Sequence, residues 1–477
     1  MKRFLILSLL FGLGAFAISP VFSQSDDDEE AEIEIEETPE EEEEPAPPRR
    51  NGGRQANGDD PGAPKVKIPL QQQINKAIKD GVLWLRKNQN KDGSWDPTWA
   101  SREYGTGKEI GKTYRDEMGP TFFALYTLAK CGVDYKKDRY MKRGLKYVFK
   151  ETEFLWDEMG GQSPDRKKLQ ESTRKTPRIM STYEVAASIM MIEAVYTGSA
   201  KLTGKQKKRV VSDNPLSPPR RSRIRKEQWR YMHERIRFLT VGRRLGGGGG
   251  GGRRAGGRST TTTIPGLQVQ KGPNMGGWRY QAGQQNADLS ATQFALLALR
   301  AASQAGYPVE RTSKNVYQNA ARYIMTCQRP SGGFAYQQRG GRENGSMTAC
   351  GVGSLLICKE QMMLIGQTVD PKIDASIKRG MKWLDENFDA TNNPGLDRHH
   401  FYYLYGVERV GDLAGRKEFN KKDWYVRGAR HLVGVQAADG SWNDPTEAFP
   451  PRGVNSTTLA LLFLKRATPP TVTMSDG

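Results

Sequence analysis

The sequence predicts an all-α protein built as an (α/α)6 toroid, a double-layered barrel of paired helices. A short turn of the form Gln-x-x-x-Gly-x-Trp/Phe recurs, and each copy ends an amphipathic run. Each turn is followed by a loop and then by a second helix that is smaller and more apolar. The three clear copies of the turn run from Gln89 to Trp95, from Gln328 to Phe334 and from Gln436 to Trp442. Repetition at a fixed period predicts stacked helix pairs that bury a shared core, and six such pairs are expected to close into a ring.

The first helices of the pairs are expected at 74–85, 316–324 and 424–435, where apolar residues recur at helical spacing. In each copy the Gln belongs to the last helical turn. The Gly four residues later allows positive φ. The aromatic residue two positions further is expected to fill the gap between neighbouring helices. These helices carry Lys and Arg on one side and are therefore placed in the outer layer.

The second helices are apolar over most of their circumference, which predicts a buried inner layer. They are expected at 121–129, 182–196, 291–301, 348–357, 400–410 and 456–464. Weaker copies of the turn are expected at 154–161, 276–278 and 388–395. The aromatic positions Trp278, Phe334, Phe388 and Trp442 follow at spacings of 56, 54 and 54 residues. A helix pair with two loops fills that period.

The amino-terminal residues 1–23 have the layout of a secretory signal peptide. Two basic residues precede an apolar run from Phe4 to Ile18, and Val21-Phe22-Ser23 offers a small-residue cleavage site. The run is shorter than the roughly 20 residues that a membrane span requires. We therefore expect an exported protein, periplasmic or extracellular, without a transmembrane segment.

Residues 24–64 are expected to form a disordered acidic and Pro-rich tether, because they contain too few apolar side chains to offset the entropy of ordering. The stretch Asp26 to Glu44 holds fourteen acidic residues. The toroid is expected to occupy 65–468, followed by a short tail at 469–477. Without these fourteen acidic residues and the two basic residues of the signal peptide, the chain is strongly basic, near +31 instead of +19. This favours an anionic partner, or a tether that folds back on the toroid.

Residues 201–263 interrupt the repeat as a basic, Gly-rich insertion. Between 201 and 260 there are eighteen Lys or Arg and three acidic residues, and 246–252 is an unbroken run of glycines. Residues 223–238 are expected to supply the outer helix of the third pair. A solvated surface loop is one interpretation, and docking of a polyanion is the other. The polyanion candidates are Arg220, Arg221, Arg223, Arg225, Arg243 and Arg244.

The repeated turns resemble those of the terpenoid cyclase and protein prenyltransferase superfamily, known for prenyltransferase and squalene oxidase repeats. The resemblance covers nearly all of 65–468. The segment 276–280 with 288–294, and the segment 402–411 with 423–425, resemble a branch of secreted bacterial repeat proteins without an assigned reaction. The resemblance implies a squalene-cyclase-like α/α toroid and leaves the activity open.

The zinc chemistry of protein prenyltransferases is not expected. By resemblance, that site takes an Asp, a Cys two residues later and a His in the last inner helix. Cys350 matches, but Thr348 stands in place of the Asp and Asn455 in place of the His. Arg342 matches an Arg that contacts the diphosphate. We expect no metal site and no cofactor.

The acid chemistry of squalene cyclases is not expected either. By resemblance, those enzymes protonate an alkene with an Asp-x-Asp-Asp motif, and the chain contains none. The nearest substitute is Asp116-Glu117, which lacks the third carboxylate. That pair is better explained as stabilising the start of an inner helix.

In a barrel of this kind the starts of the inner helices converge on the mouth of the central cavity. Residues 397–400 (Asp-Arg-His-His) form either a metal or acid-base patch, or a helix cap made by Asp397 beside surface-facing histidines. Glu184, Asp288 and Asp397 are candidates for a carboxylate pair, although an N-cap role also fits Asp288. The weak catalytic candidates are Asp288, Asp397, His399, His400 and Glu184. The candidates for binding at the mouth are Asp116, Glu117, Tyr183, Arg342, Cys350, Tyr402 and Asn455.

Two classes of function follow. The first is an exported, non-catalytic toroid that binds a ligand, a polymer or a partner protein. The second is an enzyme that uses the cavity, either terpenoid cyclase-like or polysaccharide-acting. Cys327 and Cys350 flank one loop, so an oxidising compartment would permit a disulfide between them. Simple packing of small buried thiols is the alternative.

Overall fold

The computed structural model describes residues 68–95, 119–158, 181–197, 211–220, 222–241, 243–245, 262–264, 266–444 and 453–467. These residues belong to one unit, Asp59–Gly477. The predicted signal peptide, acidic tether and carboxyl-terminal tail lie outside the described residues. So do Asp116, Glu117 and, within the basic insertion, residues 201–210, 221, 242 and 246–261.

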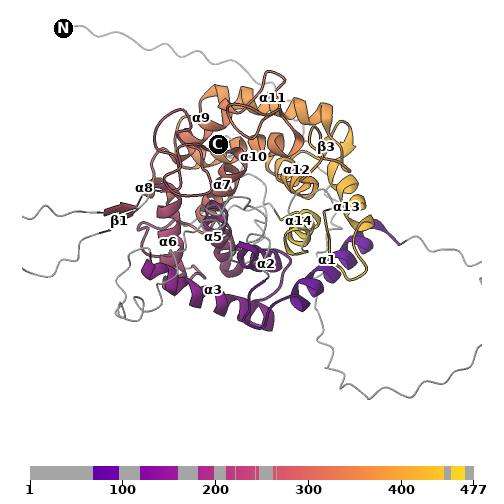
Figure 1. Ribbon diagram of the computed structural model, residues 1–477, viewed down its shortest axis with the longest axis horizontal. Coiled ribbons are helices and arrows are strands. Elements are labelled where there is room, and N and C mark those ends of the chain that lie inside the picture. Colours follow the sequence, from indigo (N-terminus) through magenta and orange to yellow (C-terminus); the bar gives the residue numbers. More distant parts are fainter. Residues whose placement is uncertain are drawn as a thin grey trace, which may run out of the picture. The chain divides into compact units, whose positions relative to one another are not determined.

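Six helices form the inner layer, as predicted. They are α2 (Gly119–Lys130), α5 (Thr182–Thr197), α7 (Leu289–Gln304), α10 (Gly345–Leu364), α12 (His400–Ala414) and α14 (Val454–Leu464). Each packs against the next in this order, and α14 packs against α2, so the inner ring is closed (Figure 1). These helices are buried almost all round, since their sequences are apolar or small on every face.

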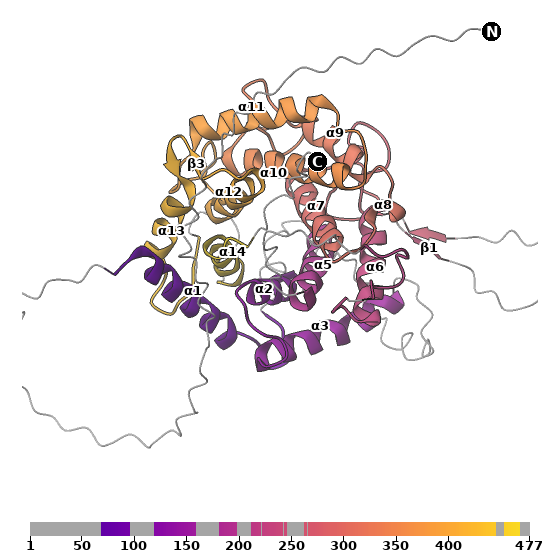
Figure 2. The same cartoon turned by 180° about the vertical axis from the view of Figure 1, so that it is seen from behind.

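The outer layer surrounds this ring, as the reverse view also shows (Figure 2). It consists of α1 (Leu70–Lys87), α3 (Arg139–Glu158), α6 (Lys226–Thr240), α9 (Val316–Thr326), α11 (Pro371–Asn387) and α13 (Trp424–Gly434). The short helix α8 (Val309–Thr312) and two small hairpins complete the described elements. The hairpins pair β1 (Arg243–Leu245) with β2 (Thr262–Ile264), and β3 (Glu418–Phe419) with β4 (Lys422–Asp423). The predicted (α/α)6 toroid is confirmed.

The recurring turn joins three helices at once. The side-chain amide of Gln436 donates to the carbonyl of Gly440 in its own turn and to the carbonyl of Ala77 in α1, both at 2.9 Å. Gln89 and Gln328 make the same two kinds of bond. The Gln436 bond connects the last outer helix to the first, so it closes the outer layer.

The aromatic residue of the turn ties the loop to the following inner helix. In four copies its backbone N–H donates to a buried Thr hydroxyl in the first turns of that helix. The pairs are Trp95 with Thr121, Trp278 with Thr292, Phe334 with Thr348, and Trp442 with Thr457, at 2.9 to 3.1 Å. In the weaker third copy Gln268 supplies the amide bond, to the carbonyl of Gly276. The Thr is therefore part of the repeat, although the sequence pattern did not single it out.

Two local features complete the fold. Of the turn predicted at 154–161, the residues up to Glu158 belong to α3, and 159–161 lie outside the described residues. The four cysteines are buried free thiols, so Cys327 and Cys350 are not bridged. Among the described residues, no helix combines the length and the apolar character that crossing a membrane requires.

Candidate ligand-binding site

Three hydroxyl groups from three inner helices meet at the ring mouth, where these helices start. The Tyr183 hydroxyl of α5 donates to the Ser290 hydroxyl of α7 at 3.1 Å. Ser290 in turn lies 3.0 Å from the Tyr402 hydroxyl of α12, which donates to Oε1 of Gln293 at 2.8 Å. The first turns of helices that are more than 200 residues apart in the chain are thus linked by one hydrogen-bonded chain.

Aromatic rings surround this chain. Phe294 lies edge-on to Tyr183 with ring centroids 5.1 Å apart, and it stacks on Tyr402 at 6.2 Å. The ring centroid of Tyr280 lies 6.0 Å from that of Tyr183. The Tyr280 hydroxyl lies 2.5 Å from the Tyr336 hydroxyl. We call Tyr183, Tyr280, Phe294, Tyr336 and Tyr402 the aromatic cluster. All five side chains are half-buried, in contrast to the fully buried rings of the core.

An ion pair borders the aromatic cluster. Asp288 is completely buried and caps α7 by accepting the Ala291 N–H at 2.8 Å, as its N-cap interpretation predicts. Its other oxygen accepts from Nη1 of Arg279 at 2.7 Å, and the same nitrogen donates to the Tyr336 hydroxyl. Burial acts to lower the pKa of Arg279, but the Asp288 carboxylate and Tyr336 outweigh it and the pKa is raised. Burial raises the pKa of Asp288, while its bonds to the Ala291 N–H and to Arg279 act to lower it.

The predicted carboxylate pair is not present as free groups. Glu184 is fully buried in a capping box at the start of α5: the Ser181 N–H donates to its carboxylate, and its own N–H donates to the Ser181 hydroxyl, both at 3.2 Å. Asp288 is engaged by Arg279. Asp397 is exposed on the loop before α12. Both buried carboxylates thus have structural roles at helix starts.

The histidine patch differs from the expectation that Asp397 caps the helix beside surface-facing histidines. His399 occupies the N-cap position of α12 with φ of 62°. His400 is only 5% exposed, and its Nε2 lies 3.1 Å from the Ala390 carbonyl. Its ring centroid is 4.8 Å from that of His431 in α13. The described residues hold no group of three or more His, Cys, Asp or Glu side chains suited to a metal ion.

The His400 environment predicts a pH-dependent stability. Burial, followed by the neighbouring His431, lowers the pKa of His400 to about 4, and burial also lowers the pKa of His431. An unfolded His titrates near 6.5. As the pH falls, the unfolded chain therefore binds the proton before the folded chain does. The contribution of neutral His400 to the free energy of unfolding is complete above about pH 6.5 and is lost as the pH falls toward 4. We expect His400→Gln to reduce the loss of unfolding free energy between pH 7.5 and 5 by about 1 to 2 kcal/mol.

Urea denaturation at the two pH values measures this difference, with His399→Gln as the matched control. His399 lies next to His400 but is less buried. The control should retain the wild-type loss. An equal loss in wild type and His400→Gln would show that His400 does not cause it.

Cys350 lies beneath the hydroxyl chain. Its Sγ donates to Oε1 of Gln293 at 3.0 Å and lies 3.1 Å from the Tyr402 hydroxyl. Burial raises the pKa of this thiol to about 12, which favours the neutral thiol over the reactive thiolate at physiological pH. Thr348, the position compared with a zinc-binding Asp, accepts the backbone N–H of Phe334 and so anchors the turn.

The remaining predicted residues are dispersed. Arg342 is exposed and Asn455 is half-buried at the start of α14. Arg220, Arg223 and Arg225 are exposed before α6, Arg243 and Arg244 lie in β1, and Arg221 is outside the described residues. Sequence reasoning missed Ser290, Gln293 and Phe294 as site residues. The signal was their i, i+3 and i+4 spacing, which puts them on one face of α7.

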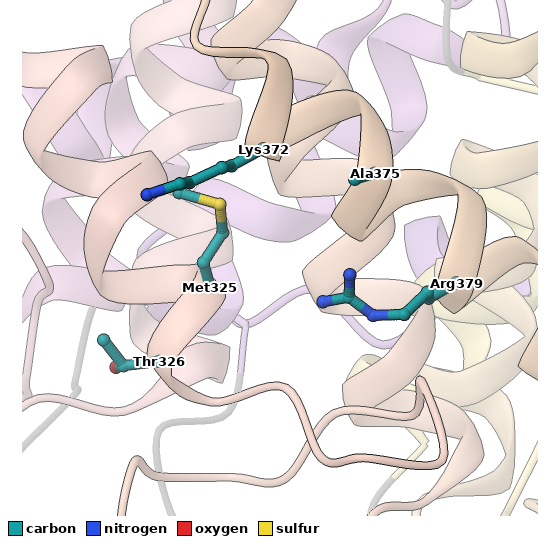
Figure 3. A pocket seen from close by; sticks show the side chains of 5 residues that line it. All are labelled: Met325, Thr326, Lys372, Ala375 and Arg379. Carbon is teal, nitrogen blue, oxygen red and sulfur yellow. The ribbon is translucent and has the colours of Figure 1, made fainter.

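A separate hollow lies on the outer layer between α9 and α11, with a volume of about 390 Å³. Figure 3 shows its lining side chains: Met325, Thr326, Lys372, Ala375 and Arg379. Four of the five residues are exposed. Long mobile side chains on an open surface bury little of a ligand, so the aromatic cluster is the better candidate site.

The comparison with family models agrees with the fold. Residues 258–396, which include α7 to α11, match the family model of the prenyltransferase alpha-alpha toroid domain. No curated protein sequence matches the chain.

Similar solved structures include three kinds of protein. The type II terpene cyclase MstE from Scytonema is 12% identical with a TM-score of 0.43, over 84% of this chain and 99% of that one. A GH76 α-mannanase from Bacteroides thetaiotaomicron is 10% identical with a TM-score of 0.47, over 84% and 98%. A protein geranylgeranyltransferase-I from Candida albicans is 11% identical with a TM-score of 0.40, over 82% and 90%.

Proposed function

We propose that this α/α toroid of the prenyltransferase and terpene cyclase type is an exported, non-catalytic protein. We further propose that it binds a ligand, a polymer or a partner protein at the aromatic cluster. One observation carries the proposal. The hydroxyls and rings of the cluster are half-buried, whereas the nearby groups that could perform acid-base or nucleophilic chemistry are engaged or neutral.

The chemistry of the cluster suits binding. Burial raises the pKa values of Tyr183 and Tyr402 well above their usual range, so both hydroxyls stay protonated. They donate and accept hydrogen bonds but do not act as bases at neutral pH. Tyr rings combine a large apolar face with one polar group and lose little conformational entropy on contact. A ligand with an apolar face and hydroxyl or carbonyl groups along it fits this surface.

The alternative, an enzyme acting in the cavity, requires an accessible acid or base within hydrogen-bond reach of its substrate. Asp288 is bonded to Arg279 and to the first turn of α7, and Glu184 is bonded within its capping box. Freeing either carboxylate would break a helix cap. These contacts support binding over catalysis.

Export and a polyanionic partner are parts of the same proposal. The amino-terminal pattern of residues 1–23 supports export. The basic residues of 201–263, with exposed Arg220, Arg223 and Arg225 beside α6, support attraction of a polyanion. Export would place the protein outside the cytoplasm, and the basic residues would attract it to an acidic surface there.

The test is a binding measurement on the full exported protein, recovered from the extracytoplasmic fraction. The probes are neutral oligosaccharides and isoprenoid alcohols, titrated by calorimetry. For a probe that binds, Tyr402→Phe is expected to weaken binding roughly tenfold, since it removes one buried hydrogen bond, and Phe294→Ala by more. Tyr425→Phe on outer helix α13 is the matched control and should bind like wild type.

Two results would overturn the proposal. Conversion of a bound probe to a product, detected by mass spectrometry and lost in Asp288→Asn, would show an enzyme. Unchanged affinity in Phe294→Ala would show that the ligand binds elsewhere.

A further inference from the structure

The opposite end of the inner ring carries a second cluster of polar groups, at the carboxyl ends of α2, α5, α7 and α12. Three cationic side chains, Lys130, Arg300 and Arg409, are buried there in the middle of the toroid. Helix carboxyl ends favour cations because of the helix dipole. A buried cation nevertheless requires a counter-charge, since transfer of an unpaired charge from water is costly.

Two of the three cations have their counter-charge. Lys130 forms an ion pair with Glu193 of α5 at 3.2 Å. Arg300 forms a two-pronged ion pair with Glu360 of α10, with contacts of 2.7 and 3.0 Å. These two pairs are electrically neutral and link neighbouring inner helices.

Arg409 differs from the other two. It is 1% exposed, and among the described residues no carboxylate lies within ion-pair distance of it. Its Nη1 donates to the Tyr405 carbonyl at 2.9 Å, its guanidinium lies 3.1 Å from the centroid of the Tyr405 ring, and its Nε makes no hydrogen bond. The adjacent Glu408 is hydrogen-bonded to Asp412 on the next turn of α12. The guanidinium thus has no ion-pair partner among the described residues.

A small cavity adjoins this guanidinium. Its volume is about 30 Å³, and it is lined by Arg409, Tyr126, Lys130, Glu193 and Arg300, together with apolar side chains. A cavity of this size holds one or two waters or one small ion. Burial raises the pKa of Tyr126, so its hydroxyl is a hydrogen-bond donor at neutral pH.

We propose that this cavity binds a small monovalent anion, chloride or the carboxylate group of a small organic acid, against Arg409. Lys130 and Arg300 of the lining are paired with Glu193 and with Glu360, which lies outside the lining, whereas Arg409 has no ion pair among the described residues and remains available to the ligand. The Tyr126 hydroxyl and the free Nε–H of Arg409 are donors of the type that anions accept. The bound ion would join α12 to α2, α5 and α7 across the ring. It would act at the opposite end of the inner helices from the aromatic cluster and does not depend on the proposed ligand there.

The test is thermal unfolding of the full chain at constant ionic strength. Sodium HEPES, whose anion is too bulky for the cavity, is replaced stepwise by sodium chloride in one series and by sodium acetate in another. We expect the Tm of the wild type to rise saturably, by roughly 2 °C at saturation, in the series that contains the preferred anion. The comparison of the two series distinguishes the free halide from the carboxylate.

Arg409→Met removes the charge and keeps most of the side-chain volume. It is expected to abolish the saturable rise and to unfold at a higher temperature than the wild type in HEPES alone, because no uncompensated charge remains. Arg427→Met, at an exposed position of α13, is the matched control and should retain the rise. A saturable rise that persists in Arg409→Met, or none in the wild type with either anion, would overturn the proposal.

A crystallographic readout covers the case in which Arg409→Met does not fold. Wild-type crystals soaked in sodium bromide should show an anomalous peak within hydrogen-bonding distance of the Arg409 guanidinium if halide is the ligand. Crystals grown in acetate should show carboxylate density there if the organic anion is preferred. A cavity without either would contradict the assignment.

Discussion

Gly440→Ala is expected to lower the free energy of unfolding by about 3 kcal/mol or more. Gly440 has φ of 88°, a conformation that costs an L-residue roughly 1 to 2 kcal/mol. An added Cβ would also lie 2.6 Å from the backbone carbonyl oxygen of Asp80 in α1. Neither backbone can move far, because the turn is held by the Gln436 bonds that connect the last outer helix to the first.

Two other glycines distinguish the backbone strain of positive φ from the steric contact with α1. Gly132 has φ of 91° with open space around it, so Gly132→Ala should show the backbone strain alone, about 1 to 2 kcal/mol. Gly434 ends α13 without positive φ and with nothing within 4 Å, so Gly434→Ala should be neutral or slightly stabilising. Chemical denaturation measures all three. A Gly440→Ala loss no larger than that of Gly132→Ala would mean that the approach to α1 does not constrain the ring.

The second large effect is expected at the buried Arg300–Glu360 pair. Arg300→Met should lower the free energy of unfolding by about 3 to 5 kcal/mol, because it leaves the Glu360 carboxylate buried without its partner. Both side chains are nearly inaccessible, at 4% and 6% exposure. The double variant Arg300→Met, Glu360→Met replaces the pair with apolar side chains and is expected to lie within about 1 kcal/mol of the wild type.

A double-mutant cycle with Glu360→Met alone completes the measurement by urea denaturation. The exposed pair Lys359–Asp374, at 2.6 Å, is the matched control, since Lys359→Met should change stability by less than about 1 kcal/mol. Additive effects of the two buried substitutions would show that the ion pair does not couple α7 to α10.

Much of the ring follows from local rules that the sequence displays. The Gln, Gly and aromatic residues of the turn recur at fixed offsets because each serves a local geometric need. The Gln satisfies backbone carbonyls, the Gly turns the chain with positive φ, and the aromatic residue fills the space between helices. Asp288 was likewise recognisable as a cap, since an Asp directly before a helix accepts its first free N–H groups.

The site was harder to predict. Tyr183 and Tyr402 were expected at the mouth from their places at helix starts, but their partners Ser290, Gln293 and Phe294 were not. His400 illustrates the same limit. A His beside a polar loop is often exposed, yet the left-handed conformation of His399 turns the next side chain inward against His431.

The sequence by itself determined the helical repeat, the inner and outer layers and the absence of the zinc-ligand and Asp-x-Asp-Asp patterns, because spacing and side-chain polarity act within one helix or one turn. Only the tertiary structure decided which polar groups are engaged. The pairing of Arg279 with Asp288, the joining of Tyr183 to Tyr402 through Ser290 and the isolation of Arg409 depend on closure of the ring. Closure sets side chains from distant segments a few ångströms apart, and hydrogen bonding, burial and charge balance at those distances define what each group can do.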